Sequence, residues 1–298
     1  MSVMPNNSKT VSLVLGSGGA RGLAHIGVIN WLDENGYRIV SVSGSSMGAL
    51  IGGIYASGKL KEYEHWMRAI TATDIPKLVD ITFDLDGLVR GERIIEALKD
   101  LIGDSLIEDL PIPFTAVASD VAREKEVWLN AGSLFDAIRA SISLPLFFKP
   151  AEINGVKLLD GGILNPVPIA PTFNDESDIT IAVNLGGKPD PDFKMPKIIN
   201  PPEEKNDFSD KIAGFIRRLD ISKKVSRSKS FSMIVIADRT FDAMQSAIAR
   251  QQLAAYPPDI ELIIPNNVCG TLEFNRAEEM IQLGYELAAL KLSSLHTK

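Results

Sequence analysis

The chain opens with two short apolar runs separated by a segment of helical spacing. Residues 10–15 and 38–42 are mostly apolar and rich in β-branched side chains, as buried strands are. Between them, apolar residues recur on one helical face, and Asn35-Gly36 then forms a typical helix end; the recurring residues are Ala24, Val28, Trp31 and Leu32. This pattern predicts a strand, a loop, a helix and a second strand, parallel to the first through a right-handed crossover.

The same alternation continues through most of the chain. Apolar spacing predicts mainly helical structure over residues 59–110, and helices at 133–140 and around 276–290. Further short apolar runs predict strands at residues 114–118, 127–129, 157–159, 179–185, 233–237 and 260–264. Strands that alternate with helices in this way indicate an α/β fold with a mainly parallel sheet.

One stretch of the second half has a different composition. Residues 188–207 contain five prolines and mixed charges, which predicts an exposed connection. Apolar spacing then predicts an amphipathic helix at 208–219, and six basic residues lie between 217 and 229. Such a helix can lie on an anionic membrane surface or pack its apolar face on its own domain. Both interpretations stay open, so peripheral membrane contact is one hypothesis.

Length and charge narrow the class of protein. With 298 residues and 45% hydrophobic content, the chain suits one large α/β domain, and we expect a single domain over residues 1–298. The formal net charge of −7 argues against nucleic acid as the main ligand. Cys269 is the only cysteine, so an internal disulfide and a cysteine-based metal cluster are both excluded.

The N-terminal segment predicts where the protein resides. Residues 1–8 are polar and lack the basic start and apolar core of a secretory signal. No run approaches the ~18 consecutive apolar residues that a membrane-spanning helix needs. We therefore expect a cytoplasmic protein.

A G-x-S-x-G motif follows the second predicted strand. In Gly44-Ser45-Ser46-Met47-Gly48 the central serine stands where a strand passes directly into a small-residue helix. Such an elbow holds the serine hydroxyl exposed at the edge of a sheet, and glycines flank it because side chains would clash there. The motif alone recurs by chance, but strand, turn and helix are all present here. Ser46 is therefore a candidate nucleophile.

A glycine-rich loop, Gly16-Ser17-Gly18-Gly19-Ala20-Arg21-Gly22, follows the first strand. A dinucleotide site would need an acidic residue near the end of the second strand, where serines and a glycine stand, and the P-loop pattern does not match. The loop is either a tight structural turn or an oxyanion hole, in which the amides of Gly18, Gly19 and their neighbours stabilise negative charge. Arg21 could add positive charge. Because the two predicted strands are parallel, this loop and Ser46 should face each other.

A serine hydroxyl needs a base within hydrogen-bond reach. The chain has three histidines: His25 falls within the first helix, His65 in a surface helix and His296 in a polar tail. A carboxylate is the alternative base if partial burial raises its basicity. Asp160 suits this role because it ends an apolar run and is followed by two glycines, and Asp120 is its rival.

Three motifs now stand in order: the glycine loop, the serine elbow and Asp160-Gly161-Gly162. In this the chain resembles the bacterial branch of the patatin-like phospholipase family, closely over residues 10–186 and more loosely over 259–290. Residues 140–148 also resemble the family segment between elbow and aspartate. One position departs from the usual loop motif, because Ser17 stands where a glycine is common.

The resemblance implies a three-layer α/β/α fold and a Ser-Asp dyad. Ser46 would be the nucleophile, Asp160 the base, and the amides of Gly18, Gly19 and Arg21 the oxyanion donors, with no metal or organic cofactor. The expected function is a serine lipid acyl hydrolase of the phospholipase A, lysophospholipase or carboxylesterase type. The alternatives are an acyltransferase and a lipid-binding or regulatory protein with little turnover, which Ser17 and the proline-rich loop could favour.

Overall fold

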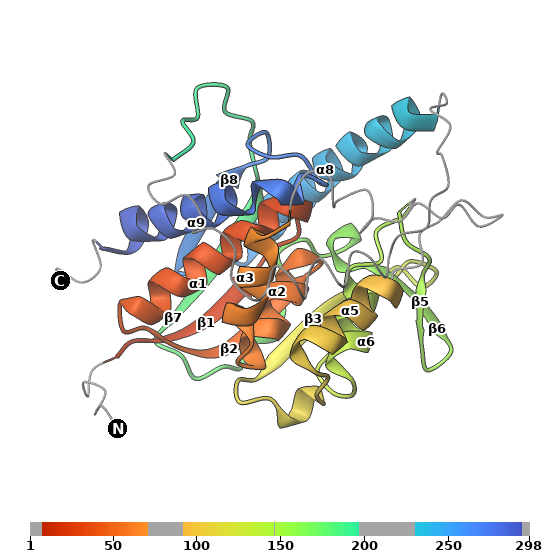
Figure 1. Cartoon of the computed structure of the whole chain (residues 1–298), viewed down its shortest axis with the longest axis horizontal. Helices are drawn as coiled ribbons and strands as arrows, with labels where there is room; N and C mark the ends of the chain where they lie inside the picture. Colours follow the sequence, from red (N-terminus) through yellow and green to blue (C-terminus); the bar gives the residue numbers. More distant parts are fainter. Residues whose placement is uncertain (1–7, 71–91, 146, 197–229, 294–298) are drawn as a thin grey trace.

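The computed structural model describes residues 8–70, 92–145, 147–196 and 230–293, and the rest of the trace is grey in Figure 1. The helices are α1 (Ala24–Glu34), α2 (Met47–Ala56), α3 (Leu60–Arg68), α5 (Glu92–Ile102), α6 (Leu134–Ser141), α8 (Ser230–Ala255) and α9 (Ala277–Leu292). The strands are β1 (Thr10–Leu15), β2 (Arg38–Ser45), β3 (Phe114–Asp120), β4 (Lys125–Leu129), β5 (Ala151–Ile153), β6 (Val156–Asp160), β7 (Ile179–Gly187) and β8 (Ile260–Pro265).

The strands form one sheet, in which hydrogen-bonded pairing runs along the path β5-β6-β3-β2-β1-β7-β8, and β4 pairs with β3 outside this path. Strands β3, β2, β1, β7 and β8 are parallel neighbours, whereas β4 and β6 each pair antiparallel with β3, and β5 pairs antiparallel with β6. The mainly parallel sheet is as the sequence predicts. Parallel strands need cover on both faces, because each face carries apolar side chains.

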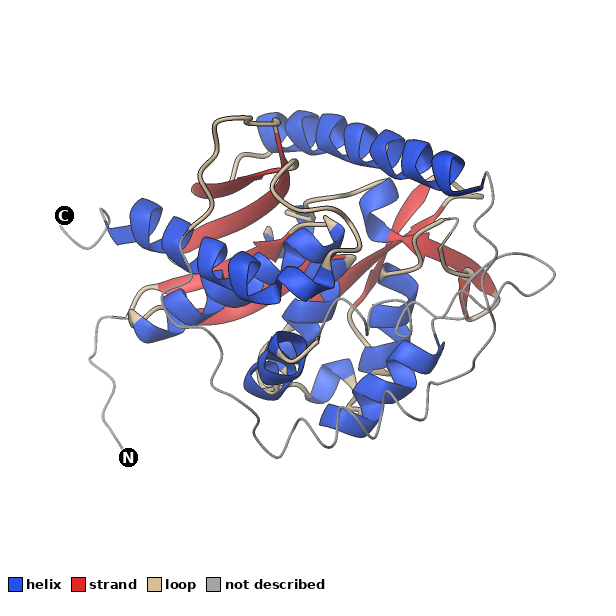
Figure 2. Cartoon of the chain, turned by 45° about the horizontal axis from the view of Figure 1, so that its top comes forward, coloured by secondary structure: helices blue, strands red, loops and turns tan. Residues whose placement is uncertain are grey.

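Helices cover the sheet on both sides. Leu13 and Leu15 of β1 face a large apolar core to which α1, α2, α3, α5, α6 and α9 contribute. Val14 faces the opposite side and packs near Ala249 and Leu253 of α8, since successive residues of a strand point to opposite faces. Figure 2 shows α8 crossing one side of the sheet while the other described helices gather on the opposite side. The fold is a three-layer α/β/α arrangement, as expected.

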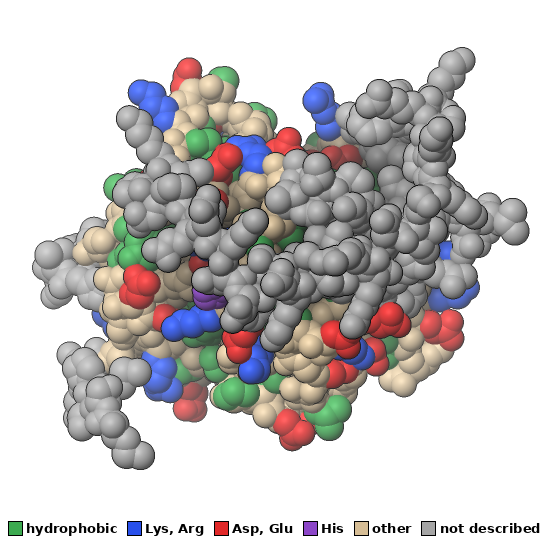
Figure 3. All heavy atoms as spheres, viewed as in Figure 1, with side chains coloured by type: hydrophobic (Ala, Val, Ile, Leu, Met, Phe, Trp, Pro, Cys, Tyr) green, Lys and Arg blue, Asp and Glu red, His purple; other side chains and the backbone are tan. Residues whose placement is uncertain are grey.

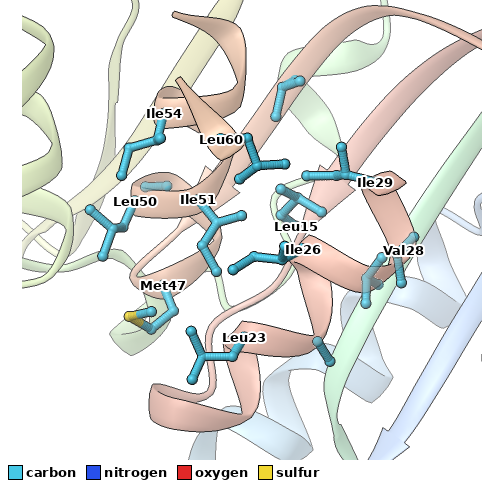
Figure 4. Packing of buried hydrophobic residues seen from close by; sticks show 14 of the residues in the cluster. Leu15, Leu23, Ile26, Val28, Ile29, Met47, Leu50, Ile51, Ile54 and Leu60 are labelled. Carbon is cyan, nitrogen blue, oxygen red and sulfur yellow. The ribbon is translucent and has the colours of Figure 1, made fainter. Parts of the chain in front are cut away.

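The larger core is packed around α1 and α2. Leu15 of β1, Ile26 of α1 and Ile51 of α2 lie together, fully buried (Figure 4). On its other side α1 lies directly against α9. A Cβ on Gly27 would collide with the carbonyl oxygen of Ile281 in α9, so the glycine lets the two helix backbones touch.

The sequence prediction is wrong for residues 233–237, which belong to helix α8 and not to a strand. The run Met-Ile-Val-Ile-Ala is apolar and β-branched, but it continues without a turn signal into a helix of 26 residues. Short apolar runs of this kind do not separate strand from buried helix by pattern alone. The helix expected at 208–219 and the basic residues 217–229 lie outside the described residues.

The described helices include none that is long and apolar enough to cross a membrane. On the molecular face shown in Figure 3, acidic and basic side chains of the described residues are interspersed.

Candidate active site

Strands β2 and β6 end head to head on one edge of β3. Ser45, the last residue of β2, pairs with Val117, and Asp160, the last residue of β6, pairs with Ala118. At both positions β4 occupies the other edge of β3, so β2 and β6 must share an edge. Because β2 runs parallel to β3 and β6 antiparallel to it, the carboxyl ends of β2 and β6 meet. This topology places Ser46 beside Asp160.

Ser46 occupies the sharp turn between β2 and α2. Its φ of 55° and ψ of −121° form a backbone conformation that residues other than glycine rarely adopt. Gly48 makes the turn possible, because a Cβ there would collide with the carbonyl oxygen of Leu15. The Ser46 hydroxyl donates a 2.6 Å hydrogen bond to Oδ2 of Asp160. The elbow therefore delivers the hydroxyl to a carboxylate and not to an imidazole.

Asp160 is almost fully buried, with 1% of its surface exposed. Its Oδ1 accepts a 2.8 Å hydrogen bond from the amide of Gly162, at the start of the turn η3 (Gly161–Ile163). Burial raises the pKa of this carboxyl from about 3.8 to about 7, and the bonds from Ser46 and Gly162 oppose that rise. A carboxylate of this basicity is suited to accept a proton near neutral pH.

Ser141, at the end of α6, holds the backbone of Ser46, a contact that the sequence did not reveal. Its hydroxyl accepts a 2.9 Å bond from the amide of Ser46 and donates a 2.6 Å bond to the carbonyl oxygen of Val117. The first amides of a helix have no partner within the helix, so this bond supplies one at the entry to α2. Its only sequence signal was a position within the 140–148 segment.

Two further serines of β2 fasten this strand to the chain that follows Asp160. The hydroxyl of Ser45 donates to the carbonyl oxygen of Asn165, and that of Ser43 donates to the carbonyl oxygen of Pro168, both at 2.6 Å. All four residues are buried. The alternating serines of β2 thus tie the serine strand to the aspartate segment.

Ser46 and Asp160 line an apolar cavity of about 130 Å³. Gly19 and Met47 also belong to its wall. Most of the lining is aliphatic or aromatic and comes from the helices that follow the elbow and from the segment after α6; it includes Tyr63, Trp66, Met67, Leu98, Ile142 and Phe147. The helices expected within residues 59–110 therefore border the site through α3 and α5.

The glycine loop reaches the cavity through Gly19, whereas Gly18 and Arg21 are not part of the wall. Within the described residues, the amides of Gly18 and Gly19 donate to no backbone carbonyl, while Ala20 donates to Thr271 at 2.9 Å. The Arg21 side chain is buried and its guanidinium is paired with Asp242 at 2.6 Å. Its charge is therefore directed to α8 rather than supplied to the cavity.

Ser17 fits its place in the loop. Its amide donates to the carbonyl oxygen of Pro166 at 2.8 Å, and its hydroxyl donates to Oε1 of Gln245 at 3.2 Å. Ser17 does not have a positive φ. This position therefore does not need the conformational freedom of glycine.

Three other candidate bases lie in the part of the chain that the structure describes, whereas His296 lies outside the described residues. His25 is fully buried, its Nε2 bonds the carbonyl oxygen of Gly16 at 2.9 Å, and burial lowers its pKa to about 4. His65 is exposed on α3, where its Nδ1 bonds the carbonyl oxygen of Lys61. Asp120 pairs with Arg123 at 2.7 Å, which lowers its pKa. None of the three lines the cavity.

Among the described residues, no group of three or more histidine, cysteine, aspartate or glutamate side chains is placed to hold a metal ion.

The family model for patatin-like phospholipases matches residues 13–173, which include Ser46 and Asp160. The chain belongs to this family. An uncharacterized NTE family protein of Mycobacterium tuberculosis is 38% identical over 98% of this chain and 94% of its own length. A lysophospholipase nte1 of Emericella nidulans is 28% identical over 97% of this chain, which spans 18% of that protein.

A member of the family from an animal and a solved structure extend the comparison. Neuropathy target esterase sws of Drosophila melanogaster is 32% identical over 62% of this chain and 13% of its own length. The crystal structure of VipD from Legionella pneumophila covers 96% of this chain and 67% of that chain, with a TM-score of 0.54 and 16% identity. At that identity the likeness concerns the patatin-like fold alone.

Proposed function

We propose that this patatin-like protein is a serine lipid acyl hydrolase that cleaves fatty-acyl esters through an acyl-enzyme on Ser46, with Asp160 as the base. The observation that carries the proposal is the 2.6 Å bond from the Ser46 hydroxyl to Asp160, formed in the wall of an apolar cavity. The names of the relatives, lysophospholipase and esterase, support the reaction class.

In the first half-reaction, Ser46 Oγ attacks the ester carbonyl carbon while Asp160 takes the hydroxyl proton. The carbonyl oxygen becomes an oxyanion. We assign as its donors the amide of Gly19, which lines the cavity, and the amides of the loop residues Gly18 and Arg21, which lie near Gly19 in the sequence. The tetrahedral intermediate collapses by breaking the bond to the alcohol oxygen. That oxygen receives the proton from Asp160 and leaves, so the acyl group stays on Ser46.

In the second half-reaction, water takes the place of the alcohol. Asp160 accepts a proton from water, whose oxygen attacks the acyl carbon, and the bond to Ser46 breaks as Ser46 regains a proton from Asp160. The products are a carboxylic acid and free enzyme. Because Asp160 serves as base and then acid in both halves, a pKa near 7 suits both tasks.

The cavity favours a lipid acyl chain as the substrate group beside Ser46. Its wall is built mainly from aliphatic and aromatic side chains such as Trp66, Met67 and Leu98. Each methylene that leaves water for such a wall contributes about 0.8 kcal/mol. Phospholipids, lysophospholipids and simple fatty-acyl esters all present such a chain.

We also propose that the enzyme is cytoplasmic and contacts membranes peripherally to reach its substrate.

The test treats purified protein with a fluorophosphonate probe and measures fatty-acid release from phospholipids, lysophospholipids and short-chain esters. We expect the probe on the peptide that contains Ser46, and release that Ser46→Ala abolishes. Ser57→Ala is the matched control, because Ser57 bonds the carbonyl oxygen of Ile54 at the far end of α2. Labelling that persists in Ser46→Ala would refute the proposal.

Two other outcomes identify the alternatives. Fatty-acid binding with neither labelling nor release would point to a lipid-binding protein. Labelling with release that depends on an added alcohol, and yields its ester, would point to an acyltransferase.

A further inference from the structure

The buried Arg21 guanidinium ties the glycine loop to helix α8. Its Nη2 lies 2.6 Å from Oδ1 of Asp242 and its Nη1 lies 3.2 Å from Oδ2, so the pair is bidentate. Nη1 also donates to the carbonyl oxygens of Asn266 at 3.0 Å and Cys269 at 3.2 Å. The Arg21 side chain is 3% exposed and that of Asp242 is 24% exposed. A cation buried to this degree needs its counter-charge, because an unpaired charge away from water is strongly unfavourable.

The same face of α8 contacts two loops: the glycine loop and the loop between β8 and α9, which contains Thr271. Gln245 accepts from the hydroxyl of Ser17 in the glycine loop, and Asp238 accepts from the hydroxyl of Thr271 at 3.1 Å. Residues 238, 242 and 245 are spaced by four and three positions, which places them on one side of a helix. All three residues belong to the single long helix α8 (Figure 1).

The two loops are also joined to each other next to Ser46. Ala20 donates its amide to the carbonyl oxygen of Thr271, and Gly19, with a φ of +56°, leaves no room for a Cβ against Thr271. Gly19, Thr271 and Ser46 all line the cavity. A shift of Arg21 would therefore move the loop from which the proposed oxyanion donors come.

We infer that Asp242 is a positioning residue that acts through Arg21 to set the glycine loop over Ser46. This inference rests on the proposed function. Its effect should fall on the step in which the oxyanion forms, since preorganised donors stabilise the transition state more than the bound substrate. A displacement of about 1 Å at such a site lowers the rate by up to about 100-fold.

The test compares Asp242→Asn, Asp242→Glu, Arg21→Gln and the double variant Arg21→Gln with Asp242→Asn. The readouts are kcat, KM and the rate of fluorophosphonate labelling, because the phosphonyl oxygen uses the same donors. We expect Asp242→Asn to lower kcat and the labelling rate by about 10- to 100-fold with KM within about twofold. Asp242→Glu should recover part of the loss. Adding Asp242→Asn to Arg21→Gln should cost less than twofold more, because both act through one contact.

Asp178→Asn is the matched control. Asp178 accepts 2.7 and 2.8 Å bonds from the amide and hydroxyl of Thr10, at the end of β1 opposite the glycine loop. At a temperature where each variant is folded by circular dichroism, Asp178→Asn should keep the wild-type kcat. Three results would overturn the inference: an unchanged labelling rate in Asp242→Asn, an equal loss in Asp178→Asn, or additive losses in the double variant. The proposed function would still stand in each case, provided that the wild-type protein is labelled at Ser46. A wild-type protein that is not labelled at Ser46 would overturn both.

Discussion

The amide of Ser46 donates a 2.9 Å hydrogen bond to the hydroxyl of Ser141, a residue 95 positions further along the chain. The same hydroxyl donates to the carbonyl oxygen of Val117 in β3. One side chain thus connects the elbow, the end of α6 and the sheet strand on which β2 and β6 meet. The strained backbone of Ser46 is held by this connection as well as by the turn itself.

Replacement of Ser141 by alanine is expected to lower both stability and activity. The change leaves the Ser46 amide and the Val117 carbonyl without their partner, and each buried unpaired group costs about 1–3 kcal/mol. We expect a loss of about 2 kcal/mol in the free energy of unfolding and about a tenfold lower kcat. Urea unfolding and initial rates measure these, with Ser57→Ala as control. Wild-type values for both would show that the bond does not support the elbow.

The pH dependence of the reaction should follow Asp160. The carboxyl acts as a base only when ionised, and its pKa lies at about 7. We expect kcat/KM to fall about tenfold per pH unit below pH 7 and to level off above it. Measurement from pH 5 to 9 with a soluble short-chain ester tests this. A profile that is flat down to pH 5 contradicts the assignment of Asp160 as the base.

Asp160 should also make the native protein less stable as pH rises. Its native pKa of about 7 exceeds the ordinary 3.8, so the folded state binds the proton more tightly than the unfolded state. The stabilisation from the protonated form is complete below about pH 4 and is lost as pH rises to 7. Asp160→Asn, which cannot ionise, should therefore be inactive yet more stable than wild type at pH 8. The comparison is urea unfolding at pH 5 and 8, and a variant less stable at pH 8 would be the contrary result.

His25 is expected to support the loop and not the proton transfer. His25→Gln keeps a side-chain amide that can donate to the carbonyl oxygen of Gly16, so Ser46 should still react with a fluorophosphonate. Because burial lowers the native pKa of His25 to about 4, below its usual 6.5, the wild-type protein should lose stability as pH falls from 6.5 to 4. This contribution should vanish in His25→Gln. Complete loss of labelling in a folded His25→Gln protein would favour His25, and not Asp160, as the base.

Met67 offers a test of the acyl pocket. Met67→Phe places a rigid ring in the wall of the cavity, and each methylene kept out of the pocket should cost about 0.8 kcal/mol. We expect kcat/KM to fall for long-chain esters and to change little for short ones. The control is Met244→Phe, because Met244 is 51% exposed on α8. Equal losses at all chain lengths would place the acyl chain elsewhere.

Local sequence patterns predicted those parts of the site whose residues are close together in the sequence. The strand, elbow and helix around Ser46 and the turn after Asp160 each have their signal in a short window, and the structure has them at the same positions. The parallel pairing of β1 with β2 then followed from chain order and handedness. These elements come from local rules, so one sequence was enough to find them.

Long-range contacts could not be predicted in this way. Asp242 meets Arg21 across 221 positions, and nothing near either residue announces the other. The error at residues 233–237 has the same origin, because the length of α8 and its packing on the sheet decide its structure, and not the five apolar residues themselves. The sequence suggested that Arg21 could add positive charge to the oxyanion hole, whereas its guanidinium pairs with Asp242.

The close contact of α1 with α9 also bears on where this protein could be divided. The region matched by the family model ends at residue 173 and contains Ser46 and Asp160. Gly27 nevertheless packs against Ile281, far beyond that limit, and β1 has β7 as its second neighbouring strand. A fragment that ends at residue 173 would contain the glycine loop, the serine elbow and Asp160, but it would expose the face of α1 that packs on α9 and the edge of β1 that pairs with β7. A chimaera between two members of the family should therefore exchange the whole region from β1 to the end of α9.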